Sequence, residues 1–203
     1  MRFITHRGQP REYEEAESGL WLFSVSQIRK TCFDSMKNVP PDLLEAARHR
    51  GTLVHRFLWM HLAYRGGIIE APPIVPEIEG YCFSVERWAK KNDVRPLLLE
   101  YRSMNRRLGY AGQVDAKVLY GTKQIETLMD GKSGVPTITD SMQLLLYNEM
   151  EHLRSKQLLD VYFQKDGSEA EEVFVDIRKK VTEWPWAMGG LSVLQGQVNH
   201  GCR

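Results

Sequence analysis

The chain has 203 residues, of which 42% are apolar and 26% are charged, and its net charge is +1. This length predicts one domain with one sizeable core, and no apolar run approaches the ~18 residues that a membrane span requires. The three cysteines, Cys32, Cys82 and Cys202, form no CxxC pair. A disulfide framework and a four-thiolate iron–sulfur cluster are therefore excluded.

The first residues, MRFITHRGQPREYEEAESG, are polar and lack the apolar segment of a secretory signal. We therefore expect a cytoplasmic protein. Residues 1–19 are expected to form a flexible amino-terminal arm. Residues 20–203 are expected to form a single domain.

Helices are predicted where apolar residues recur at helical spacing between start and stop signals. The longest begins at Pro41, where proline suits a first turn, and ends before Gly66-Gly67. The predicted helices are Gln27–Met36, Pro41–Tyr64, Phe83–Asn92, Thr137–Leu153 and Val181–Gln197.

Three strand-like runs with short linkers predict an antiparallel meander over Arg95–Met104, Gly109–Tyr120 and Lys123–Met129. A helix long enough for a crossover precedes Gln157–Gln164, so this fourth strand should lie parallel to the third. A further strand is expected at Glu172–Arg178. The predicted fold class is α/β, with a central mixed sheet flanked by helices.

Two acids and a lysine mark the predicted hairpin as a candidate site. Asp115 lies in a strand between Val114 and Ala116, where an uncompensated charge is costly. The hairpin turn places residues 128–130 across from Asp115, and two carboxylates meeting there would attract a cation. Asp130-Gly131 alone is a common turn dipeptide, but Lys132 follows at once, and the Gly131 carbonyl could bind a metal.

Other polar residues stand out in apolar surroundings. His55 lies in the long helix four residues after Gly51, a helical glycine that suggests a close approach of backbone or ligand. A lone helical histidine is more commonly a packing or surface residue. Glu100 interrupts an apolar strand. Gln143 and Tyr147 share a helix face, where a simple polar stripe is the other interpretation.

These residues occur in a recognisable order: Gly51-xxx-His55, Glu100, Gly112-xx-Asp115, Asp130-x-Lys132 and Gln143-xxx-Tyr147. The order resembles the RecB-like branch of the PD-(D/E)XK nucleases, especially its small phage-type exonucleases, over about residues 20–165. Two departures are the absence of the four-cysteine cluster of some relatives, and Ser133 where many have threonine. The resemblance implies a restriction-endonuclease-like core.

The resemblance also implies roles. His55, Asp115, Asp130 and the Gly131 carbonyl would bind Mg²⁺ or Mn²⁺, without an iron–sulfur cluster. The catalytic residues would be Asp115, Asp130, Lys132, Glu100, Gln143 and Tyr147. The implied activity is a metal-dependent DNA exonuclease that leaves 5′-phosphates and serves recombination, repair or phage DNA processing in a bacterial or phage-infected cell.

Nearby basic residues, Arg102, Arg106, Arg107 and Lys117, would track phosphates; a solvated strand end is the other interpretation. Tyr110, Trp59 or Tyr64 would stack on bases, although core packing suits Trp59 better. DNA is the expected partner, as single strands or duplex ends, and no association with a membrane is expected. Two alternative functions stay open: a flap or junction endonuclease, and a catalytically idle nucleic-acid-binding module of the same fold. A homo-oligomer or a recombination-protein partner is also possible.

Overall fold

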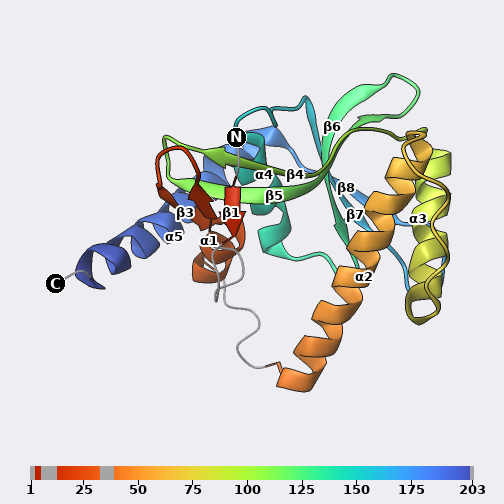
Figure 1. The fold of residues 1–203 in the computed structure, drawn as a ribbon, viewed down its shortest axis with the longest axis horizontal. Coiled ribbons are helices and arrows are strands. Elements are labelled where there is room, and N and C mark those ends of the chain that lie inside the picture. Colours follow the sequence, from red (N-terminus) through yellow and green to blue (C-terminus); the bar gives the residue numbers. More distant parts are fainter. Residues whose placement is uncertain (1–2, 6–12, 33–38, 202–203) are drawn as a thin grey trace.

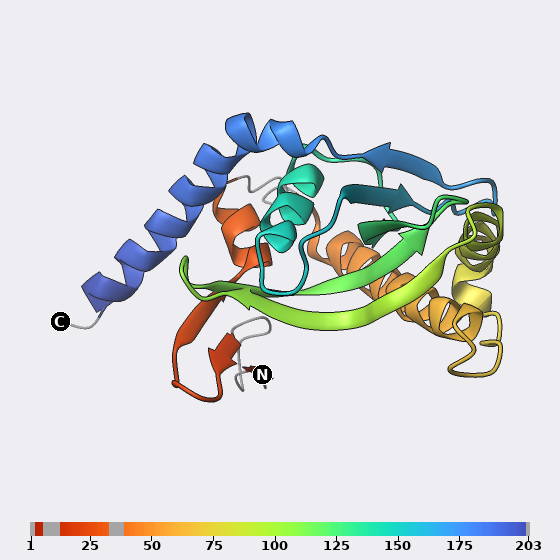
Figure 2. The same ribbon diagram turned by 90° about the horizontal axis from the view of Figure 1, so that it is seen from above.

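The computed structural model describes residues 3–5, 13–32 and 39–201, which form a mixed sheet flanked by helices (Figures 1 and 2). The predicted α/β class is confirmed. The strands are β1 (Phe3–Thr5), β2 (Tyr13–Glu15), β3 (Trp21–Ser24), β4 (Arg95–Asn105), β5 (Tyr110–Tyr120), β6 (Ile125–Lys132), β7 (Gln157–Tyr162) and β8 (Glu171–Phe174).

Most of the helices begin or end where the sequence signals predict. They are α1 (Val25–Cys32), α2 (Pro41–Arg65), α3 (Glu79–Lys91), α4 (Ile138–Asn148) and α5 (Lys180–Gly201), with 3-10 turns at Pro76–Ile78 and Ile177–Lys179. Pro41 stands in the first turn of α2. Thr137 and Asp140 form a capping box at the start of α4, which satisfies backbone N–H groups that have no partner inside the helix.

The predicted meander is confirmed: β4, β5 and β6 pair antiparallel, and β7 pairs parallel with β6 after the α4 crossover. The register aligns four acids on four neighbouring strands. Leu99 and Met129 both pair with Ala116, which places Asp115 between Glu100 and Asp130, and Asp130 pairs in turn with Asp160. The acids thus form a row across the sheet.

One edge of β5 changes partner along its length. It pairs with β3 at Tyr110 and Ala111 and with β6 from Ala116 onward, while β4 pairs along the opposite edge. Residues 112–115 therefore have no registered strand pair on this edge, although β6 continues beside Asp115 and the Gly131 N–H contacts its side chain. The interruption contains Asp115.

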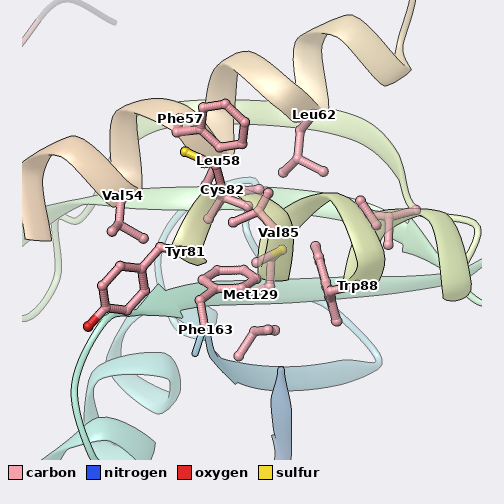
Figure 3. Packing of buried hydrophobic residues seen from close by; sticks show 14 of the residues in the cluster. Val54, Phe57, Leu58, Leu62, Tyr81, Cys82, Val85, Trp88, Met129 and Phe163 are labelled. Carbon is pink, nitrogen blue, oxygen red and sulfur yellow. The ribbon is translucent and has the colours of Figure 1, made fainter. Parts of the chain in front are cut away.

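Two apolar clusters pack the sheet. The first joins α2 and α3 to β5, β6 and β7 through residues such as Leu58, Trp88 and Met129 (Figure 3). The second joins α1, α4 and α5 to the same strands through residues such as Ile28 and Leu158. Leu99 packs against the first cluster, whereas Leu98 and Tyr101 pack against the second. Residues 99 and 101 would share a face in a regular strand, so the alternation of faces is broken at Glu100, which has a positive φ of 47°.

The main differences from the predicted elements lie at the ends of the chain. Tyr13–Glu15 is not a loose arm but a strand paired with β3, and Glu15 is buried. Residues 1–2 and 6–12 of the expected arm lie outside the described residues, as do residues 33–36 of the predicted first helix. Helix α5 continues through Pro185. Within the described part of the chain, no helix has both the length and the apolar character to cross a membrane.

Candidate active site

A cleft of about 920 Å³ opens at the interrupted edge of β5, between α2 and the segment formed by β2, β3 and α1. It brings together most of the residues that the sequence singled out, although they come from α2, three strands and α4. The predicted residues that line it are His55, Glu100, Arg102, Asp115, Asp130, Lys132, Gln143 and Tyr147.

Asp115 is held from two directions. Its Oδ2 lies 3.0 Å from His55 Nδ1 and accepts a hydrogen bond of 2.7 Å from the Gly131 N–H. Although burial opposes the charged form, His55 and the Gly131 N–H lower the pKa of Asp115. The Asp115 carboxylate in turn raises the pKa of His55 to about 9. The two side chains thus form an ion pair on the cleft wall.

Asp130 is paired with Lys132 on the same strand. Lys132 Nζ contacts Asp130 Oδ2, and the Asp130 Oδ1 accepts a 3.0 Å hydrogen bond from Gln143. Burial raises the pKa of Asp130. Burial disfavours the ammonium form of Lys132, but Asp130 and Asp140 outweigh it and raise the pKa of Lys132. Lys132 is therefore a cationic hydrogen-bond donor.

Gln143 links the two sides of this pair. Its Oε1 accepts a 2.9 Å hydrogen bond from Lys132, and its Nε2 donates to Asp130 and, at 3.1 Å, to the Tyr147 hydroxyl. One amide thus fixes the orientation of both members of the ion pair. The spacing of Gln143 and Tyr147 on α4 makes this possible, since residues four apart face the same way.

Sequence reasoning missed a layer behind Lys132. Arg29 of α1 donates to Gln143, to Thr139 at 2.8 Å and to Asp140 at 2.9 Å. Asp140 lies 3.5 Å from Lys132 and accepts from the Tyr162 hydroxyl at 2.9 Å. Asp140 therefore caps α4 and also compensates two cations of the site.

Asp160 was also missed. It is buried beside Asp130 in the sheet register, and its Oδ1 has no hydrogen-bond partner among the described residues. Burial, and then the charge of Asp130, raise the pKa of Asp160 to about 8. The signal that identified Asp115, an acid inside an apolar strand, was present in Gln157-Leu-Leu-Asp-Val-Tyr162.

Glu100 occupies the other end of the row of acids. Gln113 donates to Glu100, and Arg102 donates to Gln113 at 3.0 Å. Burial, and then Asp115, raise the pKa of Glu100. Glu100 is thus a more basic carboxylate than an exposed glutamate and lines the cleft.

Two glycines permit the close packing around the acids. A Cβ on Gly131 would lie 2.5 Å from Leu58 of α2, and one on Gly112 would lie 2.6 Å from Tyr147. Gly51 was expected to mark such an approach, but a Cβ there would meet only Ser133 Oγ at 3.7 Å. The expected close approach of the backbone is therefore wrong, because this distance is an ordinary van der Waals contact. Gly51 lines the cleft, so a close approach of a ligand stays a prediction.

Of the seven residues predicted to contact nucleic acid, Arg102 and Trp59 line the cleft and the other five do not. Tyr110 is completely buried and donates to the Leu146 carbonyl, so its predicted stacking role is wrong. Arg106 pairs with the buried Glu15, and Lys117 pairs with Glu126. Arg107 is exposed elsewhere. Trp59, named above as a possible stacking residue, also lines the cleft. The missed cleft residues are Arg29, Arg48 and Arg56.

The donor set suits Mg²⁺ or Mn²⁺, because carboxylates and an imidazole surround Asp115 and the Gly131 backbone lies against it. Among the described residues, however, no three His, Cys, Asp or Glu side chains have the arrangement of a metal site. Asp130 is turned instead toward Lys132 and Gln143. A bound metal ion would therefore take the place of the His55 proton that faces Asp115. It would also supply part of the positive charge that Lys132 now places beside Asp130.

No protein-family model and no curated protein matches the chain. Among solved structures, it is similar to one described as "Crystal structure of SSO0001", at 17% identity over 83% of this chain and 84% of that one. The TM-score is 0.32, too low to support an argument about fold or function. The functional argument therefore depends on the site itself.

Proposed function

We propose that the protein is a metal-dependent DNA exonuclease of the PD-(D/E)XK type. The observation that carries the proposal is the pairing on the cleft floor. Asp115 and Asp130 stand at matching positions of two adjacent strands, with His55 against one and Lys132 against the other. The ordered motifs of the sequence support the same assignment.

In the proposed reaction, water attacks the phosphorus of a phosphodiester, and the bond to the 3′ oxygen breaks to leave a 5′-phosphate and a 3′-hydroxyl. His55, Asp115, Asp130 and the Gly131 carbonyl would hold the divalent ion. When bound, such an ion lowers the pKa of a water and neutralises charge on the phosphate.

The remaining polar groups divide the work. Lys132 donates to a non-bridging phosphate oxygen, because its ammonium cannot accept a proton. Glu100, whose pKa burial raises, is suited to accept the proton of the attacking water. Gln143 and Tyr147 keep Lys132 and Asp130 aligned as the phosphate enters.

The direct test is incubation of the protein with end-labelled linear DNA and Mg²⁺ or Mn²⁺. We expect metal-dependent release of nucleotides by the wild type and loss of that activity in Lys132→Ala. Lys123→Ala, at an exposed turn, is the matched control and should stay active. Equal degradation by wild type and Lys132→Ala would refute the proposal.

Closed single-stranded circles separate an exonuclease from a flap or junction endonuclease, since only the latter would nick them. Isothermal titration with Mn²⁺ separates an enzyme from a catalytically idle module. Absence of Mn²⁺ binding, even with DNA present, would favour the idle module.

A further inference from the structure

One wall of the cleft carries groups that the chemistry above does not use. Arg48, Thr52, Arg56 and Trp59 line the cleft from α2, at spacings that place them on one helix face. Eleven residues of helix span about 16 Å, so the stripe runs well past the acids. Arg48 and Arg56 are exposed, and the amino-terminal part of α2 extends beyond the sheet (Figure 1).

Trp59 is the unusual member of the stripe. It is half-buried, and it is not among the described residues that form the apolar clusters. Its ring instead borders the cleft. An indole that follows two arginines on one helix face is a combination that stacks on a base while neighbouring cations bind phosphates.

Strand β4 supplies a further cation to the cleft lining. Arg102 of β4 is exposed and is oriented by Gln113. The cleft lining thus combines arginines from α2 and β4 with the acids Glu100, Asp115 and Asp130. The phosphates of a polyanion bound in the cleft would contact Arg48 and Arg56 of α2 and Arg102 of β4. Such phosphate contacts do not depend on the base sequence.

The depth of the floor favours an unpaired strand. Asp130 is 2% exposed, and the side chains of Asp115 and Lys132 are 12% and 15% exposed. A duplex keeps its bases stacked inside, out of reach of Trp59, whereas a single strand can turn a base toward an aromatic ring and its phosphate toward a recessed group.

We propose that the cleft is a track for single-stranded DNA, with Trp59 as the stacking platform and Arg48, Arg56 and Arg102 as phosphate contacts. The inference deepens the proposed function and rests on it for the identity of the polymer. Duplex ends would then be substrates only after their terminal base pairs open.

The test measures binding in EDTA, so that no strand is cut. A labelled single-stranded oligonucleotide and a blunt hairpin of the same sequence are titrated by fluorescence anisotropy. We expect the single strand to bind at least about 10-fold more tightly, because only an unpaired base can stack on an aromatic ring. Equal or tighter binding of the hairpin would overturn the proposal.

Variants locate the contacts. Trp59→Leu should weaken single-strand binding about 5- to 150-fold, the usual effect of removing one stacking ring, and Trp59→Phe should weaken it less. Trp186→Leu, at a 63% exposed tryptophan of α5, should change nothing. Should Trp59→Leu fail to unfold cooperatively, Trp59→Phe carries the comparison. Unchanged affinity in a folded Trp59 variant would refute the stacking role.

Salt dependence tests the arginines. Arg48→Gln and Arg56→Gln should each reduce the slope of log affinity against log salt by about 0.7, while Arg87→Gln, exposed on α3, should not. An unchanged slope in both variants contradicts the track. Because these measurements need no cleavage, single-strand binding without nuclease activity would reject only the enzyme. Cleavage by a protein that prefers the duplex would reject only the track.

Discussion

Two partly buried carboxylate networks in this protein are built in opposite ways. Glu172 of β8 accepts hydrogen bonds from three neutral donors through one oxygen: Trp88 at 2.7 Å, Asn92 at 3.0 Å and Tyr120 at 2.6 Å. These donors come from α3, the residue after it and the end of β5. Neutral donors satisfy a carboxylate without bringing in a second charge, which is how a structural acid is usually held.

The cleft acids are compensated by cations instead. His55 faces Asp115, Lys132 faces Asp130, and Arg29 faces Asp140. Buried ion pairs add little net stability, because desolvation offsets the attraction. The contrast indicates that the Glu172 network stabilises the fold, while the cleft network maintains charge where a metal and a phosphate would bind.

The variant with the largest expected effect on this contrast between a structural and a functional acid network is Asp115→Asn. The amide oxygen can still accept from the Gly131 N–H, and His55 can lose its proton once the carboxylate is gone. The unfolding free energy should therefore fall by less than the roughly 3–5 kcal/mol that breaking a buried ion pair costs. Cleavage of DNA should fall at least about 10³-fold, because a donor to the metal is lost. Single-turnover cleavage and urea unfolding measure the two effects. A variant that keeps activity would remove Asp115 from the site.

The reverse outcome is expected at Glu172. Glu172→Ala leaves the Trp88, Asn92 and Tyr120 donors without their acceptor, which should lower the unfolding free energy by about 2–3 kcal/mol. Nuclease activity at a temperature where the variant is folded should be unchanged. Glu171→Ala, at the exposed neighbour, is the matched control. A loss of activity without a loss of stability would contradict the structural role.

Asp140→Asn probes the layer behind Lys132. Asparagine can still accept from the Thr137 N–H and preserve the cap, but it removes the charge that faces Lys132 and Arg29. We expect kcat to fall about 10- to 100-fold, the usual effect of an outer partner, with KM little changed. Asp176→Asn, near the surface, is the control. An increase in KM alone would show a binding role instead.

The smallest expected effect concerns His61, a buried base outside the cleft. Burial, and then Arg65, lower the pKa of His61 to about 4 from the ordinary 6.5. Between pH 6.5 and about 4, His61 binds a proton in the unfolded chain but not in the folded protein. The stabilisation is therefore complete above pH 6.5 and is lost as the pH falls toward 4, at up to about 1.4 kcal/mol per pH unit.

Urea unfolding across pH 4–7 measures this slope. His61→Phe, which preserves the stacking on Phe57, should flatten it, while His49→Gln at an exposed histidine should not. An identical slope in His61→Phe would show that other groups cause the acid sensitivity. Either result shows whether the burial of His61 contributes to the pH dependence of the unfolding free energy.

The sequence predicted those parts that depend on local signals. Short turns dictated the meander, and with it the alignment of Asp115 with Asp130. Pro41 defined where α2 begins. Contacts between distant segments could not be predicted: Arg29 and Asp140 are 111 positions apart, and Asp140 reads simply as a capping residue. Tyr110 was misassigned because nothing in a strand sequence tells which face α4 covers.

The Asp115–Gly131 hydrogen bond joins residues only 16 positions apart, and Lys132 pairs with Asp130 within β6. His55 and Arg29, by contrast, belong to α2 and α1. Loop closure makes near contacts form sooner than distant ones. During folding the meander would therefore bring Asp115, Asp130 and Lys132 together before His55 and Arg29 are in place. Pulsed hydrogen exchange should show β5 and β6 protected before α1. The cleft is then the last part of the molecule to acquire its shape, and a chain that stops short of that step would have a sheet but no site.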